Sequence, residues 1–121
     1  MSAFADLETI IPRQIWQGVV GRVVQGDRLT AAVVELEPGG VVPEHRHDNE
    51  QLGIVLAGSV SFTIAGETRQ LGPGGTYRIP GGAPHSVDAG PEGAVVVDIF
   101  SPPRADWDDL DRLAPTRPRW P

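Results

Sequence analysis

The chain contains no cysteine, so disulfide bonds and thiolate metal ligands are excluded. It also has no apolar run near the roughly 20 residues that a membrane-spanning helix needs. Its first residues, MSAFADLETIIPRQ, lack the basic stretch followed by an apolar stretch that marks a secretory signal. These absences predict a protein of the reducing cytoplasm that makes no membrane contact.

Clusters of positive charge are absent as well. The formal net charge is −6, and no segment gathers basic residues, which argues against a nucleic-acid partner. Aromatic residues are few, with three Phe, one Tyr and three Trp. This scarcity favours a small polar ligand over a large aromatic one.

No long segment fits an uninterrupted amphipathic helix. Instead, 15 Gly and 12 Pro punctuate many short β-prone runs, among them residues 29–36, 51–56 and 94–100, and residues 57–59 predict a turn. This pattern is typical of an all-β sandwich or barrel. Antiparallel hairpins wound twice give a double-stranded β-helix, or jelly roll, which is the fold we expect.

With 121 residues, the chain is long enough for one domain with its own core. We expect an N-terminal arm over residues 1–14, a barrel over 15–104, and a short helix with a Pro-rich tail over 105–121. The helix is predicted over 107–113, because Asp106 can cap it ahead of an acidic first turn.

All three histidines of the chain lie in two short stretches that also hold the candidate metal ligands. His45 and His47 are two apart, so on a strand both rings point to one face. Gln51 follows four residues later, and His85 lies in the second stretch. Three imidazoles and one side-chain oxygen predict a site for one divalent metal ion per chain. Nothing in the sequence selects among Ni, Zn, Fe and Mn.

The spacing of these residues resembles the two sequence motifs of the cupin superfamily. The first is GGVVPEHRHDNEQLGIVLAG at 39–58, and the second is GGTYRIPGGAPHS at 74–86. Two positions depart from the usual pattern, because Gln51 stands where most cupins have Glu and Ala89 where many have Asn. The stretches HRHDNEQLGIVLAG and IFSPPRADW resemble a narrower group of small cupins, the KdgF-like pectin-degradation proteins and related polyketide cyclases. In KdgF-like proteins the fourth ligand is Gln.

The last strand carries a second set of candidate site residues. Asp98 and Phe100 share a face because they are two residues apart. A carboxylate inside a barrel is costly without a partner, which points to a functional site, although a solvent-facing Asp beside a core Phe is the simpler alternative. The resemblance implies that Asp98 is a general acid/base, that Arg104 binds a substrate carboxylate, and that Phe100 forms a wall of the site.

The resemblance implies an enzyme that opens 4,5-unsaturated uronates to their linear keto form. In this reading the metal polarises a substrate oxygen, Arg104 holds the carboxylate of a small-molecule substrate and Asp98 moves protons. Three alternatives stay open: a polyketide cyclase, another metal-dependent cupin isomerase or dioxygenase, and a non-catalytic cupin that binds a small acid.

The run from Leu52 to Leu56 is apolar on both faces. In a small barrel one of these faces points outward, and contiguous exposed apolar surface usually marks an interface. We therefore expect a homodimer with a two-fold axis, in which each chain has its own complete metal site.

Overall fold

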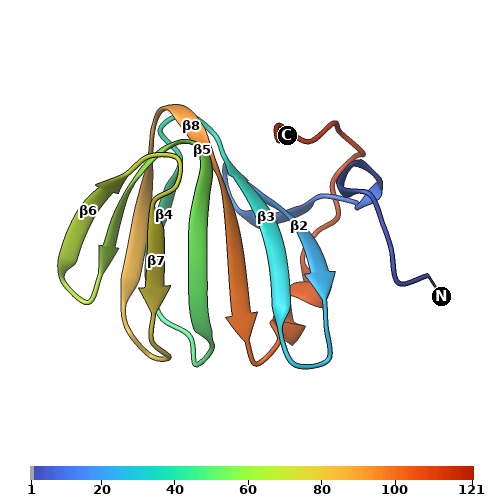
Figure 1. The fold of residues 1–121 in the computed structure, drawn as a ribbon, viewed down its shortest axis with the longest axis horizontal. Coiled ribbons are helices and arrows are strands. Elements are labelled where there is room, and N and C mark those ends of the chain that lie inside the picture. Colours follow the sequence, from blue (N-terminus) through green and yellow to red (C-terminus); the bar gives the residue numbers. More distant parts are fainter. Residues whose placement is uncertain (1) are drawn as a thin grey trace.

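The computed structural model describes residues 2–121, and its regular structure is almost entirely antiparallel strands (Figure 1). Two short 3-10 turns, η1 (Leu7–Thr9) and η2 (Ala105–Asp109), flank them. Across residues 2–121 we find no helix with the length and apolar character needed to cross a membrane. The strands are β1 (Arg13–Trp16), β2 (Val19–Gln25), β3 (Thr30–Leu36), β4 (Val41–His45), β5 (Glu50–Ile64), β6 (Glu67–Leu71), β7 (Thr76–Ile79) and β8 (His85–Ser101).

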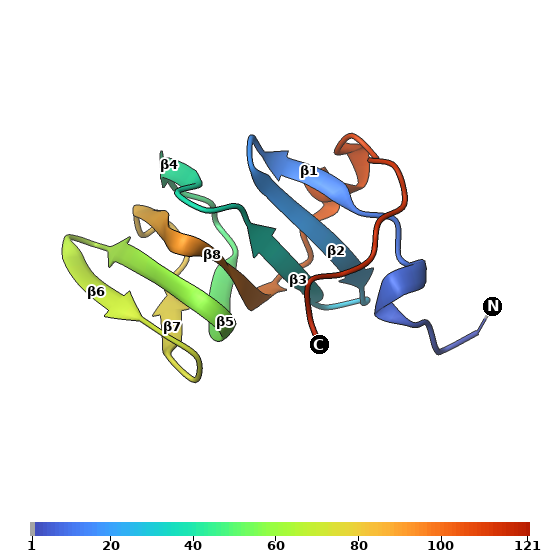
Figure 2. The same ribbon diagram turned by 90° about the horizontal axis from the view of Figure 1, so that it is seen from above.

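Two long strands, β5 and β8, connect the two layers of the fold. The pairing order is β1-β2-β3-β8-β5-β6, while β4 pairs with the first part of β8 and β7 with the first part of β5. One layer thus contains β1, β2, β3 and β7, and the other contains β4 and β6. Seen from above, β4 and β6 lie toward one end of the molecule and β1 and β2 toward the other, with β8 between them (Figure 2). This arrangement is a jelly-roll barrel, so the predicted fold class is confirmed.

The long strands bend at irregularities in their mutual pairing. Their register shifts between Val55 and Ala57 and again between Gly58 and Val60, which is how β-bulges bend a strand. Gly58 has a φ of +72°, and a Cβ there would lie 2.0 Å from the carbonyl oxygen of Gly93. The turn predicted at residues 57–59 is therefore wrong, since this stretch is a bulge within one continuous strand.

Strand alternation directs one face of each strand into the barrel. Along β3 every second residue is buried, beginning with Thr30 and ending with Leu36. The last part of β8 follows the same rule, because Val96, Asp98 and Phe100 are buried while Ile99 is exposed. The barrel interior is thus lined by aliphatic side chains with one carboxylate among them.

The predicted helix over 107–113 is wrong, because η2 is a 3-10 turn that ends at Asp109. The residues that follow pair with the start of β1 instead: the Gln14 amide donates to the Asp111 carbonyl, and Arg13 and Arg112 form an isolated β-bridge. Short helices are marginal without tertiary support, and here the tertiary contacts favour an extended chain.

The Pro-rich tail docks on the outer side of β2 and β3. Arg22 is buried, lies 2.7 Å from a Glu35 carboxylate oxygen, and donates to the carbonyl and hydroxyl oxygens of Thr116. The Arg119 amide donates to the same Glu35 oxygen. One ion pair therefore joins two strands to the C-terminal segment.

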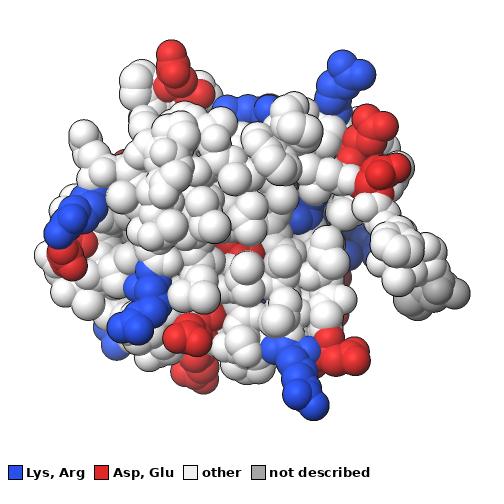
Figure 3. Space-filling model, viewed as in Figure 1, with Lys and Arg blue, Asp and Glu red and all other residues white. Residues whose placement is uncertain are grey.

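Further along the same outer face, the surface over β5 and β8 is apolar. Leu52, Ile54 and Ile99 are 43%, 45% and 38% exposed, and most charged side chains lie around the margin of this face (Figure 3). The sequence predicted that one face of residues 52–56 points outward, and in the structure Leu52 and Ile54 are on that face. The homodimer expected from them stays a prediction.

Replacing Arg22 by Leu should lower the free energy of unfolding by about 3–5 kcal/mol, because Glu35 would remain largely buried without its partner. Urea denaturation measures this change. Arg69→Leu is the matched control, since Arg69 pairs with Glu67 on the open surface and such pairs contribute about 1 kcal/mol or less. Equal losses in the two variants would contradict a structural role for the Arg22 pair.

Candidate metal centre

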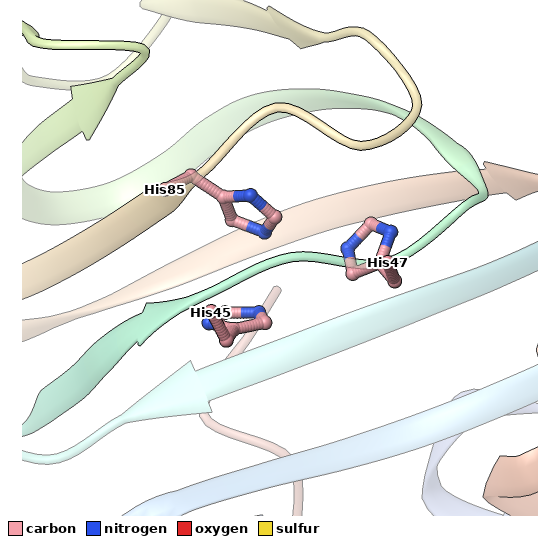
Figure 4. Close-up of side chains that lie close together, drawn as sticks. All are labelled: His45, His47 and His85. Atoms are coloured by element: carbon pink, nitrogen blue, oxygen red, sulfur yellow. The ribbon is translucent and has the colours of Figure 1, made fainter.

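Three histidines from separate parts of the chain converge on one point. β4 ends at His45, which pairs with His85 at the start of β8 in the register of these strands. His47 lies just beyond the end of β4, yet its ring also turns inward (Figure 4). One ligand nitrogen from each ring lies within 4.8 Å of the other two, which is close enough to hold a single ion.

Backbone carbonyls determine which nitrogen of each ring is free. The Nδ1 atoms of His45, His47 and His85 lie 2.8, 3.0 and 2.9 Å from the carbonyl oxygens of Pro43, Asn49 and Ala83, respectively. A carbonyl can only accept, so each Nδ1 carries the hydrogen and each Nε2 presents a lone pair. Carbonyl acceptors of this kind orient metal-binding histidines in proteins.

The remaining predicted ligand, Gln51, lies beside His47. Its Nε2 donates to Asp98 Oδ1 at 3.0 Å, which leaves its Oε1 facing His47 Nε2 at 3.1 Å. Both facing atoms are acceptors in this protonation state, so their contact is unfavourable unless a cation or a proton lies between them. The contact therefore suits a metal ion bound by both atoms.

Two of these imidazoles, His47 and His85, have lowered pKa values. Burial is the main factor that lowers the pKa of His47, and the nearby Arg104 guanidinium lowers it further. Burial likewise lowers the pKa of His85 to about 4. The buried His85 Nε2 has no hydrogen-bond partner within residues 2–121. Neutral rings with free, buried lone pairs are the form in which histidine binds metals.

The four predicted ligands thus fit a metal ion by position and by protonation state. Three imidazole nitrogens and an amide oxygen suit Zn, Fe, Ni or Mn. The donor set carries no negative charge, so a bound divalent ion would keep its full positive charge toward a substrate. The structure does not distinguish among these metals.

Asp98 is the centre of a hydrogen-bond network with Tyr77 and Gln51, which the sequence did not predict. Its side chain is 7% exposed, and burial raises its pKa to about 6 while hydrogen bonds from Tyr77 and Gln51 oppose that rise. Tyr77 donates its hydroxyl hydrogen to Asp98 Oδ1 at 2.5 Å. The same oxygen accepts from Gln51, so Oδ2 has no partner within residues 2–121.

Tyr77 is the functional residue that sequence reasoning could not place. Tyr77 on β7 lies opposite Gly53 on β5, and Gly53 in turn lies opposite Asp98 on β8. A Cβ on Gly53 would lie 2.0 Å from Tyr77 Cζ, so only glycine lets the tyrosine ring cross the strand. The sequence did hold one sign of this contact, since Gly53 is a lone glycine within a β-prone run. A glycine at such a position often marks a place where another group packs closely against the strand.

Arg104 stacks on Phe100, which lies next to His47. The guanidinium carbon of Arg104 lies 4.9 Å from the centre of the Phe100 ring and 4.5 Å from that of Trp107. Phe100 in turn packs against His47 with ring centres 5.7 Å apart. The guanidinium also binds Asp106 through Nε and Nη2, a contact that the sequence did not predict.

Phe100, Arg104 and Trp107 line an inner cavity of about 220 Å³. One end is polar, with His45, Gln51, His85, Asp98 and Arg104, and the rest is lined mainly by aliphatic and aromatic side chains. Trp16 also lines this cavity, with its ring centre 5.4 Å from that of His45.

Comparison with known proteins identifies the family. Residues 32–100, more than half of the chain, match the family profile of the cupin domain. The chain belongs to the cupin family. This cupin is 33% identical over 96 residues to the pectin degradation protein KdgF of Dickeya dadantii (strain 3937), across 78% of this chain and 87% of that protein.

Solved structures agree with this assignment. KdgF from Halomonas sp. matches this cupin with a TM-score of 0.80 at 28% identity, over 88% of this chain and 98% of that one. An RmlC-like cupin from Shewanella frigidimarina has a TM-score of 0.81 at 23% identity, over 88% and 96% of the two chains, and supports the fold alone. The resemblance to KdgF-like cupins is confirmed.

His47→Ala should abolish metal retention without unfolding the barrel, because it removes one ligand from a site that is only partly buried. Elemental analysis of the purified protein gives the metal content, and circular dichroism checks the fold. Arg46→Ala is the matched control, since Arg46 is the exposed neighbour of both histidines. Full metal content in His47→Ala would exclude this residue as a ligand.

Proposed function

We propose that this cupin is a metal-dependent enzyme that opens 4,5-unsaturated uronates to their linear keto form. The observation that carries the proposal is the buried carboxylate of Asp98, which shares the inner cavity with His45, His85 and Arg104. The similarity to KdgF, a pectin degradation protein, supports the same class of substrate.

The reaction that we propose is an isomerisation and needs no second reactant. The anomeric hydroxyl loses its proton, and the bond from C1 to the ring oxygen breaks to give an aldehyde and an enolate. The enolate becomes a ketone when C4 gains a proton, so one proton is lost and one is gained. A metal held by His45, His47, Gln51 and His85 would supply Lewis-acid polarisation of a substrate oxygen.

Asp98 is suited to both proton transfers. Its Oδ1 accepts from Tyr77 and Gln51, which leaves Oδ2 as the oxygen that can exchange a proton with substrate. Burial raises its pKa to about 6, and an acid/base group is most effective when its pKa lies near the working pH. A non-catalytic site for an acid would gain nothing from this carboxylate.

Arg104 provides recognition of the substrate carboxylate. Its guanidinium lies at the cavity over Phe100, and a guanidinium fork matches a carboxylate with two hydrogen bonds. The cavity of about 220 Å³ is below the roughly 300–1,000 Å³ of sites for drug-sized ligands. Its size favours a monosaccharide over the polycyclic product of a polyketide cyclase.

The two roles predict different kinetic defects with an unsaturated uronate as substrate. Arg104→Ala should raise KM about 10- to 100-fold, the value of a charged hydrogen bond, with a smaller effect on kcat. Asp98→Asn should lower kcat by roughly 10² or more and leave KM near the parent value. Steady-state kinetics that follow loss of the conjugated double bond measure both.

Metal content serves as the control, since each variant should retain the parent level. Asp98→Asn that turned over at the parent rate would show Asp98 to be structural. A parent protein that bound metal and converted no unsaturated uronate would contradict the proposed substrate.

A further inference from the structure

The guanidinium of Arg104 already holds a carboxylate of its own chain. Arg104 Nε lies 3.1 Å from Asp106 Oδ1, and Nη2 lies 3.0 Å from Oδ2. This is the paired geometry with which arginine binds a free carboxylate. A substrate carboxylate that used the same two donors would have to replace that of Asp106.

The position of Arg104 is determined by groups other than Asp106. Its guanidinium stacks on Phe100 and Trp107. Its backbone amide donates to Thr30 Oγ1 at 2.8 Å, and its carbonyl accepts from Gln25 Nε2 at 3.0 Å. The guanidinium therefore keeps its place at the cavity when the Asp106 carboxylate leaves.

The two partners differ in their exposure to solvent. The side chain of Arg104 is 13% exposed, whereas that of Asp106 is 67% exposed. A pair with one open partner is weak, because water solvates the freed carboxylate at little cost. Both residues line the inner cavity, so an entering ligand meets this pair directly.

We propose that Asp106 is a specificity-determining residue whose carboxylate occupies the substrate-carboxylate position on Arg104 until a carboxylated ligand displaces it. This inference rests on the proposed function for the class of ligand. A neutral sugar offers no group that can replace a carboxylate on the guanidinium fork, so the exchange selects for acids. The same competition weakens binding of acids and thereby favours their release.

The test is calorimetric binding of D-galacturonate to the metal-loaded, full-length protein. Asp106→Asn should bind this acid about three- to fivefold more tightly than the parent, since removing an exposed pair frees the fork. D-Galactose, which lacks the carboxylate, should gain nothing. Asp109→Asn removes an equal charge from the same 3-10 turn and should stay within twofold of the parent.

The gain must also depend on Arg104. In the background of Arg104→Ala, adding Asp106→Asn should change galacturonate binding less than twofold. Unchanged or weaker binding by Asp106→Asn, an equal gain in Asp109→Asn, or a gain that survives loss of Arg104 would each overturn the inference. Absence of galacturonate binding in both the parent and Asp106→Asn would overturn it as well.

These measurements involve no turnover, so they separate the two ideas. A parent protein that fails to convert an unsaturated uronate removes the proposed reaction but leaves the exchange on Arg104 supported if Asp106→Asn binds galacturonate more tightly. If the parent protein converts the unsaturated uronate but Asp106→Asn binds galacturonate no more tightly, the proposed reaction stands and the exchange on Arg104 is wrong.

Discussion

The site depends on one buried carboxylate. Asp98 is held on β8 by the Tyr77 hydroxyl from β7 and by the Gln51 amide from β5. A buried charge without partners would destabilise the barrel, so these two donors make the position tolerable. Gly53, which lies between Asp98 and Tyr77 in the sheet, leaves the space that the tyrosine ring needs.

This constraint also explains the amide at position 51. Because Gln51 donates to Asp98 through Nε2, its oxygen must face the histidines, as a metal ligand would. A glutamate there would place a second carboxylate about 3 Å from Asp98, and two carboxylates so close cannot both stay ionised. The departure from the usual cupin ligand and the presence of Asp98 are therefore two parts of one arrangement.

The sequence predicted the parts of this site that follow from local periodicity. Spacing by two residues aligned His45 with His47, and strand alternation placed Asp98 and Phe100 on one face, which the structure directs to the barrel interior. The motif spacing joined His85 to the first two histidines across the 37 residues between His47 and His85. These predictions needed no knowledge of how distant strands pair.

The parts that sequence reasoning missed depend on register and tertiary contacts. The Tyr77–Asp98 bond requires β7 and β8 to flank β5 at Gly53, which no local pattern reveals. The helix predicted over 107–113 was lost because residues 111–113 bond to the chain before β2. The Asp106 contact was hidden for the same reason, since Asp106 had been interpreted only as a helix cap.

The most direct test of this account is a Gln51→Glu variant, measured for metal content and for turnover of an unsaturated uronate. The account predicts that Gln51→Glu retains its metal and loses at least tenfold in kcat, because Asp98 can no longer stay ionised beside the new carboxylate and exchange protons. Turnover at the parent rate with full metal content would contradict the coupling of Gln51 to Asp98.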